Sequence, residues 1–141
     1  MSGVVSNLRR WLRPWSTPPD ARALGRLGER AAERYLKRRC RYRTLRRNAR
    51  IPGGEIDLVM QSPDGAVVFV EVKTRRRDDV PGEHSLTLAK RRRIVQLAQR
   101  LARREGWTNR PLQVDVVAIV WNGPRDLEIR HHPTAFGADA R

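Results

Sequence analysis

Residues Gly54–Arg75, GEIDLVMQSPDGAVVFVEVKTR, contain two apolar runs separated by the turn sequence SPDG. Alternation in EIDLVM predicts a β-strand with Glu55 and Asp57 on one face. AVVFVEVKT predicts a longer strand, antiparallel to the first, on which Glu71 and Lys73 share a face. The opposite face of the first strand is expected to carry Ile56, Leu58 and Met60. The most apolar part of the chain therefore also carries ionisable side chains.

A hairpin of these two strands brings Asp57 beside Glu71 and Lys73. Two carboxylates about 4 Å apart repel by roughly 4 kcal/mol at an effective dielectric of 20, so the cluster needs a cation. Mg²⁺ or Mn²⁺ suits hard oxygen ligands such as Asp57 and Glu71, and the metal would activate a water that Lys73 orients toward a phosphodiester. The alternative is an internal salt bridge of Lys73 with Asp57 or Glu71, without a metal.

The composition describes one small basic domain. The chain has 141 residues and 39% hydrophobic content, which is enough for a modest core. Its 30 Lys and Arg exceed its 15 Asp and Glu, and this charge of +15 indicates a polyanionic partner, above all nucleic acid. The single cysteine, Cys40, excludes an internal disulfide and is interpreted as a small residue at a helix end. We expect a soluble, cytoplasmic protein without a membrane segment, because no apolar run approaches spanning length.

The order of patterns predicts an α/β domain over residues 20–131. Residues 1–19 are basic, end in STPP and are expected to form a flexible N-terminal arm, whereas residues 132–141 are expected to form a frayed tail. Between them the order is α-β-β-β-α-β plus a short edge strand, which gives a mixed central sheet flanked by helices. The expected elements outside the hairpin are helices at about 20–39 and 85–105 and strands at about 42–50, 112–121 and 126–132.

The succession of GRLGERAAERYL, GEIDLV, VVFVEVKTR, a basic helix and DVVAI resembles the YraN-like family of small bacterial proteins. That family is similar to the PD-(D/E)xK superfamily, which includes restriction endonucleases and archaeal Holliday-junction resolvases. The resemblance covers about residues 21–131 and implies a single restriction-endonuclease-like domain. It leaves a homodimer open, because similar resolvases act as symmetric pairs.

The resemblance also implies roles for individual residues. Asp57 would be the first acidic ligand, Glu71 the second and Lys73 the lysine of the E-x-K triplet. Glu29 matches a glutamate on the first helix of resolvase-like branches, and Val72 would offer its backbone carbonyl to a metal. The sequence departs from the superfamily pattern at two positions. Ile56 stands before Asp57 where the pattern has proline, and Gln113 stands in LQVDVVAI where an arginine is expected.

Two basic runs flank the acidic cluster and predict a cationic approach for phosphates. Residues 30–50 hold ten Lys and Arg against a single acid, and KRRR follows at 90–93. The predicted nucleic-acid contacts are Lys90, Arg75, Arg91 and Arg47. Asp115 interrupts an apolar strand and is interpreted as a partner for an arginine, with a place in a pocket wall as the alternative. His131 and His132 are adjacent on a strand and so point to opposite faces, which is unsuitable for joint metal binding.

The leading hypothesis from the sequence is an Mg²⁺-dependent endonuclease that hydrolyses DNA phosphodiester bonds in branched, structured or other substrates. The alternative is a non-catalytic nucleic-acid-binding module that retains a resolvase-like fold and uses the charges of the site structurally.

Overall fold

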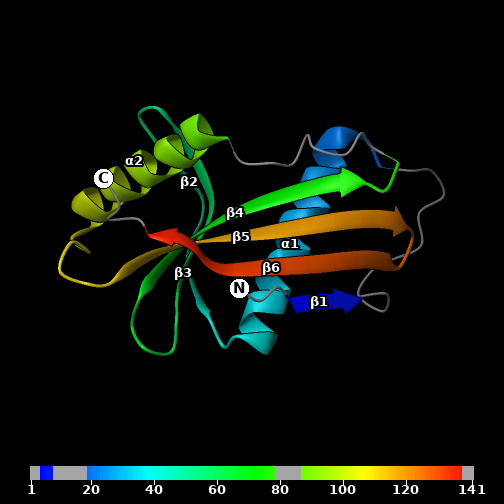
Figure 1. The fold of residues 1–141 in the computed structure, drawn as a ribbon, viewed down its shortest axis with the longest axis horizontal. Helices are drawn as coiled ribbons and strands as arrows, with labels where there is room; N and C mark the ends of the chain where they lie inside the picture. The colour runs from blue at the N-terminus through cyan, green and yellow to red at the C-terminus, as the bar shows by residue number, and fades with distance from the viewer. Residues whose placement is uncertain (1–3, 8–18, 79–86, 138–141) are drawn as a thin grey trace.

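The computed structural model describes residues 4–7, 19–78 and 87–137. Its strands form one mixed sheet in the order β1-β6-β5-β4-β3-β2, in which β4 and β5 are parallel and the other neighbours are antiparallel (Figure 1). The elements in chain order are β1 (Val4–Asn7), α1 (Ala21–Arg39), β2 (Arg43–Ile51), β3 (Gly54–Gln61), β4 (Val67–Arg76), α2 (Leu88–Glu105), β5 (Leu112–Gly123) and β6 (Asp126–Gly137). The α/β class, the mixed sheet and its flanking helices are confirmed.

The first and last strands differ from the predictions. β1 lies within the segment expected to be an arm, and it pairs with residues 128–131 of β6. β6 continues to Gly137 and lies between β1 and β5, so the prediction of a short edge strand there is wrong. Backbone pairing to β6 defines β1, and the sequence pattern did not reveal it. The greater part of the predicted arm and the end of the predicted tail lie outside the described residues, so the division into arm, domain and tail stays a prediction.

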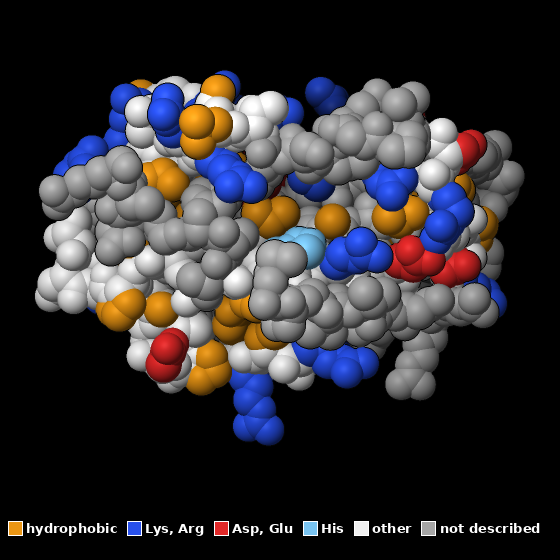
Figure 2. Space-filling view, in the orientation of Figure 1, with side chains coloured by type: hydrophobic (Ala, Val, Ile, Leu, Met, Phe, Trp, Pro, Cys, Tyr) orange, Lys and Arg blue, Asp and Glu red, His pale blue; other side chains and the backbone are white. Residues whose placement is uncertain are grey.

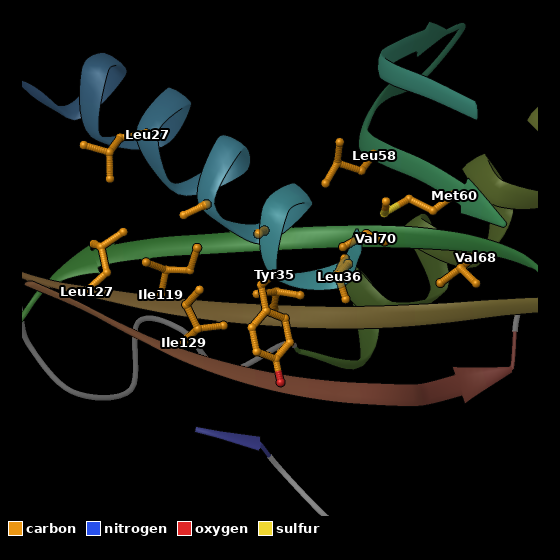
Figure 3. Close-up of a cluster of buried hydrophobic side chains, with 13 residues drawn as sticks. Leu27, Tyr35, Leu36, Leu58, Met60, Val68, Val70, Ile119, Leu127 and Ile129 are labelled. Atoms are coloured by element: carbon orange, nitrogen blue, oxygen red, sulfur yellow. The ribbon is translucent and has the colours of Figure 1, made fainter. Parts of the chain in front are cut away.

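Helix α1 covers one face of the sheet. Asp20 caps it by accepting a hydrogen bond from the backbone N–H of Ala23 at 2.7 Å. Its buried stripe packs on apolar side chains of β3 to β6, as the close-up of Leu27, Tyr35 and Leu36 shows (Figure 3). The helix approaches β4 closely at Gly28, where a Cβ atom would lie 1.8 Å from Thr74 Oγ1. Only glycine allows this approach, which fixes the height of α1 above β4.

Helix α2 covers the opposite face and also holds the β2–β3 turn. Its buried side chains pack against Phe69 and other residues of the second apolar cluster. Three of its exposed arginines donate hydrogen bonds to backbone carbonyl oxygens at or next to the β2–β3 turn. These bonds are Arg93 to Gly53 at 2.8 Å, Arg100 to Pro52 at 2.9 Å and Arg104 to Arg50 at 3.1 Å. The turn is therefore held toward α2.

Strands β3 and β4 separate at Asp57. They are paired from Leu58 to Gln61, whereas β4 continues beside β5 as far as Arg76. Ile56 belongs to the apolar cluster on the α2 side, but Leu58 belongs to the cluster on the α1 side. The prediction that Ile56, Leu58 and Met60 share one face is therefore wrong, because the strand turns away from its neighbour between Ile56 and Leu58. We call this separation of the two strands the β3–β4 fork. None of the helices in the described ranges is both long and apolar enough to cross a membrane.

Candidate functional site

Asp57 lies in the β3–β4 fork and is tied to β4 by its side chain. The backbone N–H of Val72 donates to Asp57 Oδ2 at 2.8 Å, in place of a bond to a neighbouring strand. The pKa of Asp57 is raised to about 7, chiefly by burial and next by the negative charge of Glu71, with a smaller contribution from the charge of Glu29; the Val72 N–H opposes this shift. A hydrogen bond between the Asp57 and Glu71 side chains contributes in the same direction. The structure thus brings the two predicted metal ligands together.

Lys73 completes this group from β4. Its Nζ lies 3.3 Å from Glu71 Oε2, and both side chains are half-buried, with 33% and 20% of their surface exposed. The contact provides the cation that a pair of neighbouring carboxylates requires. It is also the ion pair that the salt-bridge alternative predicts, so both hypotheses share this contact.

Glu29 reaches the fork from α1, and Asn48 holds it there. Asn48 Nδ2 donates to Glu29 Oε1 at 2.9 Å and lies 3.5 Å from Glu55 Oε1. Asn48 falls between the register pairs Arg47–Leu58 and Ala49–Ile56, and its φ of 48° is in the left-handed region. Sequence reasoning missed this residue. Asparagine tolerates positive φ better than most residues, and its presence inside a strand pattern was the available signal.

Two cavities meet the fork, one on each side of β3. The cavity on the α2 side has a volume of about 220 Å³ and is lined by Glu55, Glu71, Lys73, Lys90, Arg93, Ile94 and Leu97. We call it the α2-side cavity. The cavity on the α1 side has a volume of about 150 Å³ and is lined by Arg26, Glu29, Arg30, Glu33, Arg47, Asn48, Asp57 and Leu58. We call it the α1-side cavity.

The residues of the fork lie within the part of the chain that matches a protein family. A family model described as "Uncharacterised protein family UPF0102" matches residues 28–119. A UPF0102 protein of Chloroflexus aurantiacus is 40% identical over 123 residues, which are 86% of this chain and 99% of the relative. Another, from Symbiobacterium thermophilum, is 45% identical over 120 residues, which are 84% and 99% of the two chains. The chain belongs to the UPF0102 family. The resemblance to YraN-like proteins is confirmed.

Two solved structures share a weak likeness with this UPF0102 chain. One is described as the structure of an EndoMS-dsDNA2 complex, with 16% identity and a TM-score of 0.38 over 60% of this chain. The UPF0102 chain spans 33% of that EndoMS chain. The other is Pyrococcus furiosus SfsA in complex with Ca²⁺, with 13% identity and a TM-score of 0.38 over 82% of this chain and 72% of SfsA. Neither likeness carries weight for the function of the UPF0102 chain.

The four predicted nucleic-acid contacts occupy different places in the UPF0102 structure. Lys90 is exposed and lines the α2-side cavity, whereas Arg91 is exposed on α2 outside the residues that line it. Arg47 lines the α1-side cavity, and its guanidinium binds both carboxylate oxygens of Glu33 at 2.9 and 2.7 Å. Arg75 donates to the backbone carbonyls of the two residues that follow it, each at 3.4 Å. Their binding of nucleic acid stays a prediction.

A buried polar cluster lies away from the fork. Asp115 is fully buried, and it accepts from Tyr42 at 3.0 Å, contacts His131 Nε2 at 2.8 Å and accepts from Gln113 at 3.0 Å. The partner that the sequence predicted for Asp115 was an arginine, and these three contacts were not foreseen. Cys40 is the C-cap residue of α1, as expected for a helix end, and its Sγ lies 3.7 Å from His131 Nδ1. Burial raises the pKa of the Cys40 thiol, and the charge of Asp115 raises it further, so the thiol stays protonated.

Proposed function

We propose that this UPF0102 protein is a metal-dependent nuclease that hydrolyses DNA phosphodiester bonds. The reaction would take place at a site formed by Asp57, Glu71 and Lys73. The observation that carries the proposal is the β3–β4 fork, where a partly buried pair of carboxylates meets a lysine beside an open cavity. A group of this kind is costly for a fold to maintain, and perturbed carboxylates in a cleft are typical of functional sites.

The residues at the fork fit Mg²⁺. This ion prefers hard oxygen ligands and is held in proteins by one or two carboxylates together with waters and substrate phosphate. Asp57 and Glu71 supply two such carboxylates, and their mutual repulsion, visible in the raised pKa of Asp57, would be relieved by a divalent cation. Within the described ranges, no group of three or more His, Cys, Asp or Glu residues is arranged to hold a metal ion.

Each residue at the fork has a distinct part in the proposed reaction. A bound metal would neutralise charge on the phosphodiester and lower the pKa of a water. The Val72 N–H holds one oxygen of Asp57 and so fixes the direction of the other. Lys73, half-buried beside Glu71, would donate a hydrogen bond to the attacking water or to a phosphate oxygen. Participation of the Val72 carbonyl remains an expectation from the family resemblance.

Basic side chains around the fork support a polyanionic substrate. Lys90 and Arg93 line the α2-side cavity, next to Glu71 and Lys73. On the face drawn in Figure 2, Lys and Arg side chains gather at the upper left, over α2. Together with the net charge of +15, this distribution would attract DNA and make its binding steeply dependent on salt.

The Lys73–Glu71 ion pair favours a second candidate function, a DNA-binding module without catalysis. In that case Lys73 would neutralise Glu71 permanently, and the fork would be a structural feature of the fold. DNA binding and salt dependence would be the same for both candidates. Only the dependence of cleavage on metal and on Asp57 and Lys73 separates them.

The proposal is tested by cleavage of labelled single-stranded, duplex, flap and four-way-junction DNA with Mg²⁺ or Mn²⁺. We expect metal-dependent cleavage by the wild type and a loss of about 100-fold or more in Asp57→Asn and Lys73→Ala. Lys37→Ala is the matched control, because Lys37 is an exposed lysine on α1 that lines neither cavity; its ion pair with Glu33 at 3.6 Å is longer than the contacts that hold Glu33 to Thr44 and Arg47. Tight, salt-sensitive binding with no cleavage by any variant would favour the DNA-binding module, and equal cleavage by wild type and both site variants would reveal a contaminating nuclease.

A further inference from the structure

We propose that the α1-side cavity is a second phosphate site, in which Arg26 and Arg30 bind the DNA phosphate next to the one that is cleaved. The inference rests on the proposed function, and it adds substrate-binding residues that the sequence did not single out.

Four charged residues of α1 face the α1-side cavity. Their spacing of i, i+3, i+4 and i+7 places them on one side of the helix, and they are Arg26, Glu29, Arg30 and Glu33. The approach of Gly28 to Thr74 holds this part of α1 against β4, beside the fork. The charged face is therefore positioned by packing, and it borders a cavity that can accept a small anion.

The two acids of this face already have partners. Glu33 is buried and accepts hydrogen bonds from Thr44 at 2.5 Å and Arg47 at 2.9 Å, and Glu29 accepts from Asn48 at 2.9 Å. Arg26 and Arg30 are exposed, and across the described ranges the structure shows no hydrogen bond or ion pair for either guanidinium. Two arginines one turn apart, at a cavity whose acids are already bonded, present donors for a phosphate.

Asp57 connects this cavity to the proposed reaction centre. It lines the α1-side cavity, and its carboxyl contacts Glu71, which lines the α2-side cavity. A DNA strand whose scissile phosphate lies at Asp57 and Glu71 would therefore present a neighbouring phosphate to Arg26 and Arg30. The other side of the scissile phosphate would face Lys90 and Arg93. This arrangement predicts phosphate contacts on both sides of the cleaved bond.

The test is binding of a single-stranded oligonucleotide in which one phosphate at a time is replaced by a neutral methylphosphonate. Anisotropy is measured in EDTA, so that metal-dependent cleavage cannot occur, and the scissile position is mapped separately with Mg²⁺. The variant is Arg26→Gln with Arg30→Gln. Its matched control is Arg103→Gln with Arg125→Gln, which removes two exposed arginines that line neither cavity.

Neutralising the phosphate adjacent to the cleaved bond should weaken wild-type binding about tenfold and should leave binding by the Arg26/Arg30 variant unchanged. The variant should also lose about 0.7 from the slope of log affinity against log salt, whereas the control keeps the wild-type slope. Equal effects of both double variants, or a methylphosphonate profile that the Arg26/Arg30 variant shares with wild type, would overturn the inference while metal-dependent cleavage stands. If the wild type neither binds nor cleaves DNA, the proposed function fails and the inference fails with it. Far-UV circular dichroism and thermal melts verify that both double variants are folded.

Discussion

Asp57→Asn should make the protein more stable, and increasingly so as the pH rises. The folded-state pKa of Asp57 is raised to about 7 from 3.8, first by burial and then by the charge of Glu71. Because the folded pKa lies above the unfolded one, the contribution of protonated Asp57 to stability is complete below pH 3.8 and is lost as the pH rises through about 7. Asparagine cannot ionise, yet its side-chain oxygen can still accept the Val72 N–H bond.

The size of this effect follows from linkage, because a pKa difference of one between the folded and unfolded states corresponds to about 1.4 kcal/mol. At pH 5 the unfolded chain gains ~2 kcal/mol by ionising Asp57, and at pH 8.5, above both pKa values, the gain reaches ~4 kcal/mol. The stability advantage of Asp57→Asn should therefore grow by ~2 kcal/mol between these two pH values.

Urea unfolding of both proteins in EDTA at pH 5 and pH 8.5 measures this difference. Asp64→Asn is the control, because a hydrogen bond from the Ser62 hydroxyl lowers the pKa of Asp64, so its replacement should bring no gain as the pH rises. Addition of Mg²⁺ at pH 8.5 should stabilise the wild type and reduce the advantage of the variant, since a metal would bind the ionised pair. A stability difference that does not change with pH would refute the assignment of a destabilised carboxylate at the fork.

Three further predictions concern the surroundings of the fork. Gly28→Ala should lower stability by about 1–3 kcal/mol in thermal melts, because its Cβ would meet Thr74 Oγ1. Gly25→Ala is the control and should be neutral or stabilising, because a Cβ at Gly25 meets open space. Equal effects of the two substitutions would contradict the packing of α1 on β4. Arg100→Ala removes a hydrogen bond to the Pro52 carbonyl and should speed amide hydrogen exchange in the β2–β3 turn, with Arg103→Ala as the unaffected control. Asn48→Ala removes the amide that donates to Glu29 and should reduce DNA cleavage. Asn48→Gly removes the same amide but tolerates the positive φ, so relative to Asn48→Ala it should restore thermal stability without restoring cleavage. Recovery of both stability and cleavage in Asn48→Gly would assign Asn48 a backbone role alone.

The α/β class and the residues of the fork could be predicted from sequence because their signals are local. The apolar stripe of α1 and the alternation in β4 each follow from a few neighbouring residues. The convergence of Asp57, Glu71 and Lys73 followed from one hairpin with a short turn. Such features depend on side-chain spacing, which the sequence states directly.

Other features depend on contacts between distant segments and were not predictable in this way. β1 is a four-residue edge strand defined by its pairing with β6. The departure of β3 from β4 breaks the alternation at Asp57, and the β2–β3 turn beyond it is bound by arginines of α2 that lie some 40 or more residues later in the chain. The basic residues of α2 appeared in the sequence as a surface for phosphates, although three of them also hold this turn in place.

The fork explains why an aspartate at position 57 serves the fold as well as the proposed chemistry. On one side, β4 pairs with β5 in parallel from Val67 to Arg76. On its other side, the pairing with β3 ends at Leu58, next to Asp57. The Val72 N–H there needs an acceptor, and Asp57 supplies one at 2.8 Å. The same bond directs the carboxyl to Glu71, where its ionisation is costly. Asp57→Ala would therefore remove a proposed metal ligand and also leave a backbone N–H without its partner, so a loss of activity in that variant would have two causes. Asp57→Asn retains the acceptor and removes only the charge, and it is the variant that separates the structural role of this residue from the proposed catalytic one.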